Sequence, residues 1–324
     1  MADDPLLSVR DLSIAFEKHD GRIEAVHAVS FDLARGEILG LVGESGAGKS
    51  LTSMAVVGLI DHPGRISARS VTLDGKRIDG LSEQAFRQVR GREIGVIFQD
   101  PLTSLDPLFT VGDQLVETIR IHLPLSRAEA EARAVELLAE VGIPAPERRM
   151  QSYPHELSGG MRQRVVIALA LCAEPKLVIA DEPTTALDVS IQAQIIALLQ
   201  RLCRERGMSI VLVTHDMGVI AECADRVAVM YAGRIVEIGD TEQVIKRPRH
   251  PYTRGLMGAI PRIGERQERL TQIDGAMPRP GAVFTGCAFA PRCPEADAAC
   301  RAERPALLPA GKALVACHHA MGGV

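Results

Sequence analysis

Gly36-Glu37-Ile38-Leu39-Gly40-Leu41-Val42 runs directly into Gly43-Glu44-Ser45-Gly46-Ala47-Gly48-Lys49-Ser50, and this stretch decides the fold. The first part is an apolar run with the length of a buried strand, and a helical pattern follows over residues 49–60. Between them stands G-x-x-x-x-G-K-S, whose small residues let backbone N–H groups and a helix N-terminus surround phosphate groups. In this motif the lysine reaches the β- and γ-phosphates, and the serine hydroxyl binds Mg²⁺. The stretch therefore predicts a phosphate-binding loop, with an ordinary glycine-rich turn as the alternative.

Apolar strands and helical patterns alternate on both sides of this loop. The expected strands cover residues 7–14, 94–98, 176–180, 209–213 and 226–230. This rhythm predicts an α/β protein. Residues 101–173 break the rhythm because they contain helical patterns and no convincing strand, so we expect a helical subdomain inserted there. The helix expected at 127–141 has one apolar face, formed by Ala128, Ala132, Val135, Leu138 and Val141.

The composition changes after Glu242, where Pro, Arg and Cys become frequent. This change predicts a C-terminal extension with little regular structure. We therefore expect a main domain over residues 1–242, with its helical subdomain at about 101–173, and an extension over residues 243–324. No internal repeat is found, so the main domain occurs once.

The overall composition narrows the possible functions. Aromatic residues make up 3% of the chain, Trp is absent and the formal net charge is −4, which argues against binding to nucleic acid. The acidic start Met1-Ala2-Asp3-Asp4 lacks the features of a secretory signal, and no apolar run is long enough to span a bilayer. We expect a cytosolic protein that reaches a membrane only through a partner.

Two acids follow the predicted strand Leu177-Val178-Ile179-Ala180. Phosphoryl transfer needs charge neutralised at a metal and an oriented nucleophile. Asp181 is placed to hold Mg²⁺, and the adjacent Glu182 is placed to polarise the attacking water. The alternative is that both acids cap the next helix.

Leu157-Ser158-Gly159-Gly160 resembles the LSGGQ signature of the ATP-binding cassettes. A serine followed by two glycines at a helix N-terminus forms an anion site, with a capped helix that binds nothing as the alternative. By this resemblance the chain is identified as a P-loop NTPase ABC cassette, with a RecA-like core and an inserted helical subdomain. The resemblance implies that it binds ATP and Mg²⁺. It also implies that Ser158, Gly159 and Gly160 act in trans, on ATP held by a second cassette.

Other positions are similar to the cassette family, which implies a role for each. Gln99 resembles the glutamine that contacts Mg²⁺ in these cassettes. His215 resembles the switch histidine that contacts the γ-phosphate. Ala186-Leu187-Asp188 resembles the D-loop, which lies at the dimer interface. Phe16 is the candidate for stacking on adenine, with packing in the core as the alternative. The implied catalytic residues are Glu182, His215 and Gln99, and the implied Mg²⁺ ligands are Ser50, Gln99 and Asp181. The implied ATP contacts are Phe16, Gly43, Glu44, Ser45, Gly46, Ala47, Gly48, Lys49, Ser50 and Leu51.

Two further runs resemble the ATPase subunits of dipeptide and oligopeptide importers. They are Phe98-Gln99-Asp100-Pro101-Leu102-Thr103-Ser104-Leu105-Asp106-Pro107 and His250-Pro251-Tyr252-Thr253. The resemblance implies ATP hydrolysis at the cytoplasmic face of the membrane, driving import through two separate permease subunits supplied by a solute-binding protein. Met161, where related cassettes have Gln, points to pairing with a different second cassette. The alternatives are another cargo such as nickel or glutathione, a soluble cassette ATPase of DNA repair or translation, or a P-loop kinase.

Four cysteines gather near the C-terminus in the pattern C-x5-C-x6-C-x16-C. They are Cys287, Cys293, Cys300 and Cys317. Four thiolates can hold Zn²⁺ or an iron–sulfur cluster, and the wide spacing lacks the C-x2-C knuckle usual for zinc. The resemblance to peptide importers implies a [4Fe-4S] cluster, while unliganded thiols remain the third possibility. Cys172, Cys203 and Cys223 lie in apolar helical surroundings and are expected in the core.

Overall fold

The computed structural model describes residues 4–18, 21–185, 187–259 and 272–320. The chain forms two compact units. The first unit combines residues 1–79 with residues 213–324, and the second contains residues 80–212. Both units combine strands with helices, as the sequence predicts for an α/β protein.

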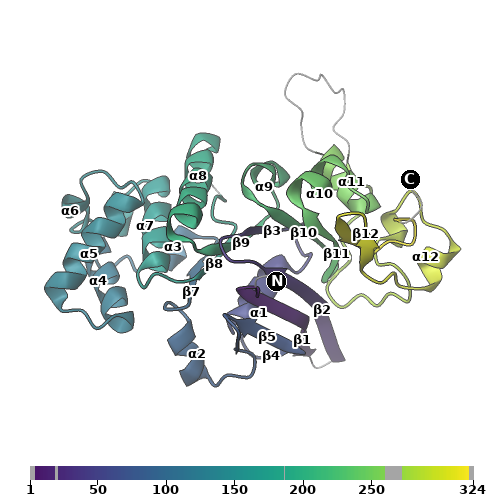
Figure 1. Ribbon diagram of the computed structural model, residues 1–324, viewed down its shortest axis with the longest axis horizontal. Helices are drawn as coiled ribbons and strands as arrows, with labels where there is room; N and C mark the ends of the chain where they lie inside the picture. The colour runs from purple at the N-terminus through teal and green to yellow at the C-terminus, as the bar shows by residue number, and fades with distance from the viewer. Residues whose placement is uncertain (1–3, 19–20, 186, 260–271, 321–324) are drawn as a thin grey trace. The chain divides into compact units, whose positions relative to one another are not determined.

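The first unit begins with an antiparallel sheet in the order β2-β1-β5-β6, with β4 also paired to β1 (Figure 1). Its strands are β1 (Leu7–Lys18), β2 (Gly21–Leu33), β4 (Gly64–Ser67), β5 (Ser70–Leu73) and β6 (Lys76–Arg77). Along the end of β2, Val29, Phe31 and Leu33 are buried, while the residues between them are not. This alternation places one face of the strand in the core.

The second sheet of this unit holds the phosphate-binding loop. Parallel pairing joins β3 (Ile38–Val42) to β10 (Arg226–Tyr231), and β11 (Arg234–Asp240) pairs antiparallel to β10. All five residues of β3 are buried, as expected for a strand covered on both faces. The helix α1 (Lys49–Val56) ends before the predicted residue 60 because Gly58 adopts φ +67°, a left-handed conformation that stops a helix.

The C-terminal extension is more regular than the sequence predicts, and it joins this second sheet. The strand β13 (Ala313–Val315) pairs with β11, and β12 (Leu308–Ala310) pairs with β13. A side chain at Gly239 would approach the Cβ of Ala313 to 2.8 Å, so glycine permits the close pairing. The helical elements around these strands are α9 (Met217–Cys223), α10 (Thr241–Lys246), α11 (Pro251–Gly258), η2 (Ala290–Arg292) and α12 (Ala298–Ala302).

The second unit contains a parallel strand pair, β7 (Ile94–Ile97) and β8 (Leu177–Asp181), and most of β9 (Ser209–Thr214), which lies beside β8. A side chain at Gly95 would approach the carbonyl oxygen of Ala170 to 2.3 Å, so glycine lets the helix α7 (Gly159–Leu171) lie close to β7. The other helical elements are α2 (Glu83–Val89), α3 (Pro101–Ser104), α4 (Val111–His122), α5 (Arg127–Glu140), α6 (Pro146–Arg149), η1 (Pro154–Glu156) and α8 (Val189–Arg206).

The helix α5 begins where its sequence dictates, and the predicted Leu138 and Val141 are buried, but the first half of the helix buries a different face from the predicted one. Ser126 and Glu129 form a capping box, in which each side chain accepts a hydrogen bond from the other residue's backbone N–H. The predicted Ala128 and Ala132 are exposed. The buried residues of the helix are Ala130, Ala134, Leu137 and Leu138. None of the helices in the described parts of the chain has both the length and the apolar character needed to cross a membrane.

Candidate functional site

The phosphate-binding loop is shaped by glycines at both ends. Gly43 has φ +151°, and a side chain there would approach the carbonyl oxygen of Met230 to 2.3 Å. Gly48 has φ +99°, and its Cβ would lie 3.2 Å from Val26 and 3.3 Å from Gly233. Both positions need a residue without a side chain, because backbone and side chains approach them closely. The loop is therefore fixed between β10, β2 and the turn at Gly233.

Lys49 is directed back over this loop. Its side chain is buried, and its Nζ donates hydrogen bonds to the carbonyl oxygens of Gly43 at 2.9 Å and Glu44 at 3.2 Å. Ser50, the next residue, is exposed, and the first turn of α1 contains no acidic residue. The positive end of the helix and the ammonium group thus lie in the same loop, which can stabilise phosphate groups.

The predicted catalytic carboxylate and Gln99 meet in the second unit. The strands β7 and β8 are parallel with Ile97 opposite Ala180, so the residues that follow them lie at the same edge. Gln99 Nε2 donates a hydrogen bond to Glu182 Oε2 at 3.1 Å, and Thr185 Oγ1 donates to the same oxygen at 2.9 Å. Asp181, the last residue of β8, is buried.

Glu182 has an unusual backbone. Its φ is +46°, in the left-handed region that costs a non-glycine residue roughly 1–2 kcal/mol. Such strain persists only where the surrounding structure imposes it, and it is concentrated at functional sites. The backbone turn and the two hydrogen bonds to Oε2 together fix the carboxylate.

Ser158 caps the helix α7, and its Oγ accepts a hydrogen bond from the N–H of Met161 at 3.3 Å. Ser158 and Gly159 are exposed. A side chain at Gly160 would approach Cγ2 of Ile191 to 2.8 Å, so this glycine also permits close packing. The first turn of α7 has no acidic residue, which leaves an exposed helix N-terminus suited to an anion.

The remaining predicted residues lie at the ends of elements. His215 is exposed directly after β9, and its neighbour Asp216 caps α9 by accepting from the N–H groups of Gly218 and Val219. Asp188 is exposed at the start of α8, whereas Ala186 of the same motif lies outside the described residues.

Phe16 is half-buried in β1. It lies opposite Ile23 of β2 and Gly64 of β4. A Cβ on Gly64 would lie 3.0 Å from the ring. The ring therefore has packing partners in the sheet, and its stacking on adenine stays a prediction.

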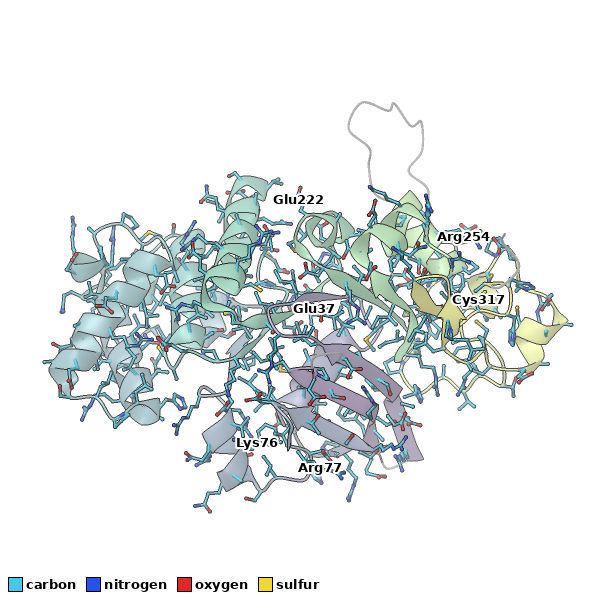
Figure 2. The ribbon with its side chains drawn as sticks, in the orientation of Figure 1. Glu37, Lys76, Arg77, Glu222, Arg254 and Cys317 are labelled. Carbon is cyan, nitrogen blue, oxygen red and sulfur yellow. The ribbon has the colours of Figure 1, made fainter. Side chains whose placement is uncertain are left out.

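The four C-terminal cysteines line one small cavity of the extension, where Figure 2 labels Cys317. Its other lining residues are His250, Pro251, Phe289, Ala290, Pro305, His318 and His319. The N–H of Cys287 donates to the carbonyl of Cys300 at 2.8 Å, and a side chain at Gly286 would approach that same oxygen to 2.3 Å. Backbone pairing thus brings these two cysteines together.

The thiols in this cavity form no disulfides, and the environment of three of them opposes ionisation. Burial raises the pKa of Cys287, Cys293 and Cys317, and charge on neighbouring thiols would raise it further. Thiolates in such surroundings need a compensating cation. The convergence of four unpaired cysteines therefore fits a metal or an iron–sulfur cluster.

Sequence reasoning missed other polar groups near the cysteines. Cys300 Sγ lies 3.5 Å from Nε2 of His319, which lies 3.4 Å from Oδ2 of Asp297. The ligand atoms of these three residues lie within 4.8 Å of one another. Sulfur, nitrogen and oxygen donors of this kind can bind zinc. The signal in the sequence was Cys317-His318-His319, where histidines directly follow a cysteine.

Sequence reasoning also missed two residues that contact the phosphate-binding loop. Tyr252 accepts a hydrogen bond from the N–H of Glu44, and Arg292 forms an ion pair with the Glu44 carboxylate. Tyr252 belongs to a run that the sequence singled out, but Arg292 carries no motif signal apart from its position beside Cys293.

The other three cysteines are in the core, as predicted. Cys172, Cys203 and Cys223 are buried. Burial raises the pKa of Cys172 and of Cys223 to about 12. These thiols are therefore inert near neutral pH.

Two protein-family models match the chain. The model described as ABC transporter matches residues 26–185, and the model described as oligopeptide/dipeptide transporter, C-terminal region, matches residues 236–300. The first match contains the loop, the signature at Ser158 and both acids. The second match contains three of the four extension cysteines.

Curated relatives are similar over almost the whole chain. The dipeptide transport ATP-binding protein DppD of Escherichia coli is 48% identical over 302 residues, covering 93% of this chain and 92% of the relative. DppD of Haemophilus influenzae is 48% identical over 313 residues, covering 97% and 95%. A putative peptide import ATP-binding protein of Brucella melitensis is 49% identical over 324 residues, covering 96% of each.

Solved structures are similar over the cassette. The ATP-binding cassette MJ0796, a dimer in a post-hydrolysis state bound to ADP and Pi, matches with a TM-score of 0.65 and 28% identity, covering 72% of this chain and 98% of that one. CbiO1 of Clostridium perfringens, part of the ABC transporter complex cbiONQ, matches with a TM-score of 0.65 and 30% identity, covering 76% and 92%. The chain therefore has the fold of an ABC cassette.

Proposed function

The chain belongs to the ABC transporter family as an ATP-binding, ATP-hydrolysing protein, and from this premise we propose that it powers the import of dipeptides or oligopeptides through a separate membrane permease. The observation that carries the proposal is the extent of similarity. Relatives described as dipeptide transport ATP-binding proteins align with both the cassette and the extension, over 93% of the chain. The family match at residues 236–300 supports the same cargo, because that region is described for oligopeptide and dipeptide transporters.

Hydrolysis follows from the roles that we assign to the site residues. Water attacks the γ-phosphorus of ATP, the bond from that phosphorus to the β,γ-bridging oxygen breaks, and ADP and phosphate form. Glu182 polarises the water and accepts its proton, and Gln99 orients this carboxylate. Lys49 and the backbone N–H groups of residues 43–51 stabilise the phosphates, His215 contacts the γ-phosphate, and Phe16 stacks on adenine. Ser50, Gln99 and Asp181 would hold Mg²⁺, which would neutralise charge on the phosphates.

The active assembly contains two cassettes, because Ser158, Gly159 and Gly160 complete the site of the partner cassette and Asp188 lies at their interface. The exposed N-terminus of α7 supports this role, and the related cassette MJ0796 is a dimer bound to ADP and Pi. We propose that the second cassette is a different chain. Both cassettes bind two permease subunits at the cytoplasmic face of the membrane, and a solute-binding protein delivers the cargo.

Reconstitution of the transporter tests this function. The chain is assembled in proteoliposomes with the permease subunits, second cassette and solute-binding protein encoded beside it. Uptake of labelled dipeptides and longer peptides is measured with and without ATP. We expect ATP-dependent peptide uptake that unlabelled peptide suppresses, whereas uptake of only nickel or glutathione would contradict the peptide assignment.

The four cysteines of the extension hold a [4Fe-4S] cluster in this proposal. Their convergence on one cavity, free of disulfides, supports it, and four thiolates are the usual ligands of such a cluster. The bound cluster would supply cross-links that hold the extension together, since ATP hydrolysis involves no redox step. Cys300 and His319 line this cavity, and together with Asp297 they offer a mixed donor set that suits zinc instead.

Purification without oxygen distinguishes the two metals. A cluster gives brown protein with broad visible absorption and about four iron and four acid-labile sulfide per chain. Colourless protein that contains zinc would contradict the cluster assignment and would indicate a zinc site at Asp297, Cys300 and His319. A Cys293→Ser variant should lose the colour, and His319→Ala should keep it.

A further inference from the structure

Glu44, the second residue of the phosphate-binding loop, is held by the C-terminal extension through its side chain. Arg292 donates from Nη1 to Glu44 Oε2 at 2.8 Å and from Nη2 to Oε1 at 3.0 Å. The Arg292 side chain is only 6% exposed. The two parallel bonds between a guanidinium and a carboxylate fix orientation as well as distance. These bonds also raise the pKa of Arg292, which stays charged.

The same residue is held through its backbone. The N–H of Glu44 donates to the Oη of Tyr252 at 2.9 Å, and the carbonyl of Glu44 accepts from Lys49 Nζ at 3.2 Å. Burial raises the pKa of Tyr252, so its phenol stays neutral. The extension thus contacts a residue whose carbonyl group accepts a hydrogen bond from Lys49, inside the loop that surrounds phosphate.

Arg292 is itself fixed by the extension. Its Nε and Nη2 donate to the carbonyl oxygens of Asp274 at 2.8 Å and Ile273 at 3.2 Å, and its guanidinium lies 5.8 Å from the centre of the Tyr231 ring. A buried arginine with this many partners has one available position. It therefore transmits the position of the extension to Glu44.

Arg292 lies in the short segment between two cysteines of the cysteine site, Cys287 and Cys293. Arg292 ends η2, which lies between Cys287 and Cys293, and backbone bonds run from Ala290 N to Cys287 O and from Cys293 N to Ala290 O. Phe289, in the same segment, lies 5.2 Å from the Tyr231 ring and 5.4 Å from the Tyr252 ring. The segment that carries two of the cysteines thus packs on both aromatic neighbours of the loop.

We propose that Arg292 is a positioning residue for nucleotide binding, which holds Glu44 of the phosphate-binding loop and is itself held in place by the occupied cysteine site. Arg292 neutralises a carboxylate that would otherwise repel the phosphates. Metal loading of the extension then sets the nucleotide affinity of the cassette, although the metal takes no part in hydrolysis.

A pair of substitutions tests the role of Arg292. In the metal-loaded full chain, Arg292→Gln should weaken binding of Mg²⁺-ADP and of a non-hydrolysable ATP analogue by about tenfold, the usual size of a lost charge-assisted pair. Adding Glu44→Gln should restore most of this loss, because no unpaired carboxylate remains. Unchanged affinity in Arg292→Gln would overturn the proposal, and a double variant no better than the single one would overturn the electrostatic mechanism.

Arg254→Gln is the matched control. Arg254, labelled in Figure 2, lies on α11 of the same extension and pairs with Glu295 at 2.7 Å, with both side chains more than 40% exposed. Breaking this exposed pair should leave nucleotide affinity unchanged. Amide hydrogen exchange gives a readout independent of affinity. Exchange at Glu44 should be faster in Tyr252→Phe and unaltered in Arg254→Gln.

The link to the cysteine site has its own test. Cys293→Ser, or removal of the metal by a chelator, should weaken ADP binding in the wild-type background and have no further effect in Arg292→Gln. Equal weakening in both backgrounds would overturn the link. If Cys293→Ser does not fold, chelation of the wild-type chain and of Arg292→Gln gives the same comparison.

This inference rests on the proposed role of residues 43–51 in binding phosphate, and its failure can be distinguished from failure of that role. Lys49→Ala tests the loop alone. If Lys49→Ala abolishes nucleotide binding while Arg292→Gln does not alter it, the loop assignment stands and the inference falls. If neither variant alters nucleotide binding, both the loop assignment and the inference are wrong.

Discussion

The side-chain amide of Gln99 donates a hydrogen bond to the carboxylate of Glu182 at 3.1 Å. The two residues are far apart in the sequence, and the parallel pairing of β7 with β8 brings them to the same sheet edge. Because Thr185 donates to the same oxygen, two hydrogen bonds fix the orientation of the carboxylate. A fixed orientation is what a group that polarises water requires.

Glu182→Gln should therefore stop hydrolysis and leave ATP binding largely intact. Glutamine keeps an oxygen that can accept from Gln99, but it cannot take a proton from water. Loss of a general base lowers the rate about 10²–10⁴-fold, equal to roughly 3–5 kcal/mol of barrier. Phosphate release and nucleotide binding are measured on the same preparation of the assembled transporter. Turnover near the wild-type rate would contradict the assignment of Glu182.

Lys49→Ala should weaken nucleotide binding itself. The ammonium group lies against the carbonyl oxygens of Gly43 and Glu44, so its removal takes a positive charge from the loop in both the ground state and the transition state. Binding of a fluorescent ATP analogue measures the effect, and Lys76→Ala is the control. Lys76 is an exposed lysine of β6 in the same unit, labelled in Figure 2, and its removal should not alter affinity.

Ser158→Arg should abolish hydrolysis while the substituted chain still binds ATP in its own loop. Arginine at this position removes the cap of α7 and fills the exposed helix N-terminus, where the partner's γ-phosphate is proposed to bind. Mixing the variant with an intact second cassette should place the defect in the partner's site. Normal hydrolysis in that assembly would refute the shared site.

Ser82→Arg separates this effect from simple loss of a helix cap. Ser82 caps α2 in the same unit and accepts a hydrogen bond from the N–H of Ala85 at 3.3 Å, the length found at Ser158. Loss of either cap costs about 1 kcal/mol of stability. Only the Ser158 variant should lose hydrolysis, whereas equal loss in both would indicate a structural defect.

Five strands were predictable because they are continuous apolar runs next to polar loops, whereas β11, β12 and β13 were not predicted. β3, β7, β8, β9 and β10 were each predicted to within two residues of their observed ends. A continuous apolar run indicates a buried strand, because the side chains on both faces of the strand must be covered. The P-loop and acid-pair motifs follow these strands directly, so their places in the fold were predicted with them.

The buried face of the first half of α5 was not predictable because that half is rich in alanine. Ala128 and Ala132 recur at helical spacing, as do Ala130 and Ala134, and small apolar residues are tolerated on either face. Neighbouring helices decide between the two faces. The ion pair of Arg292 with Glu44 was beyond sequence reasoning for another reason, because a contact across 248 positions leaves no local pattern.

Removal of the metal should change the reactivity of the cysteines in a selective way. With the site loaded, none of the cysteines should react with an alkylating reagent at neutral pH. After chelation, Cys287, Cys293 and Cys317 should be alkylated, because their thiols are only partly buried. Cys172 and Cys223 should stay unmodified until the chain is unfolded. Mass spectrometry of peptides identifies each site.

The pH dependence of this labelling follows from the pKa values. Burial holds the pKa of Cys172 and of Cys223 at about 12, so at pH 8 only about one thiol in 10⁴ is the reactive thiolate. Their alkylation in the folded chain should therefore accelerate roughly tenfold per pH unit between pH 8 and pH 10. The alkylation rates of Cys287, Cys293 and Cys317 should reach their plateau at lower pH, because burial raises the pKa of these three thiols less. Equal labelling of the extension with and without metal would show that these cysteines do not hold it.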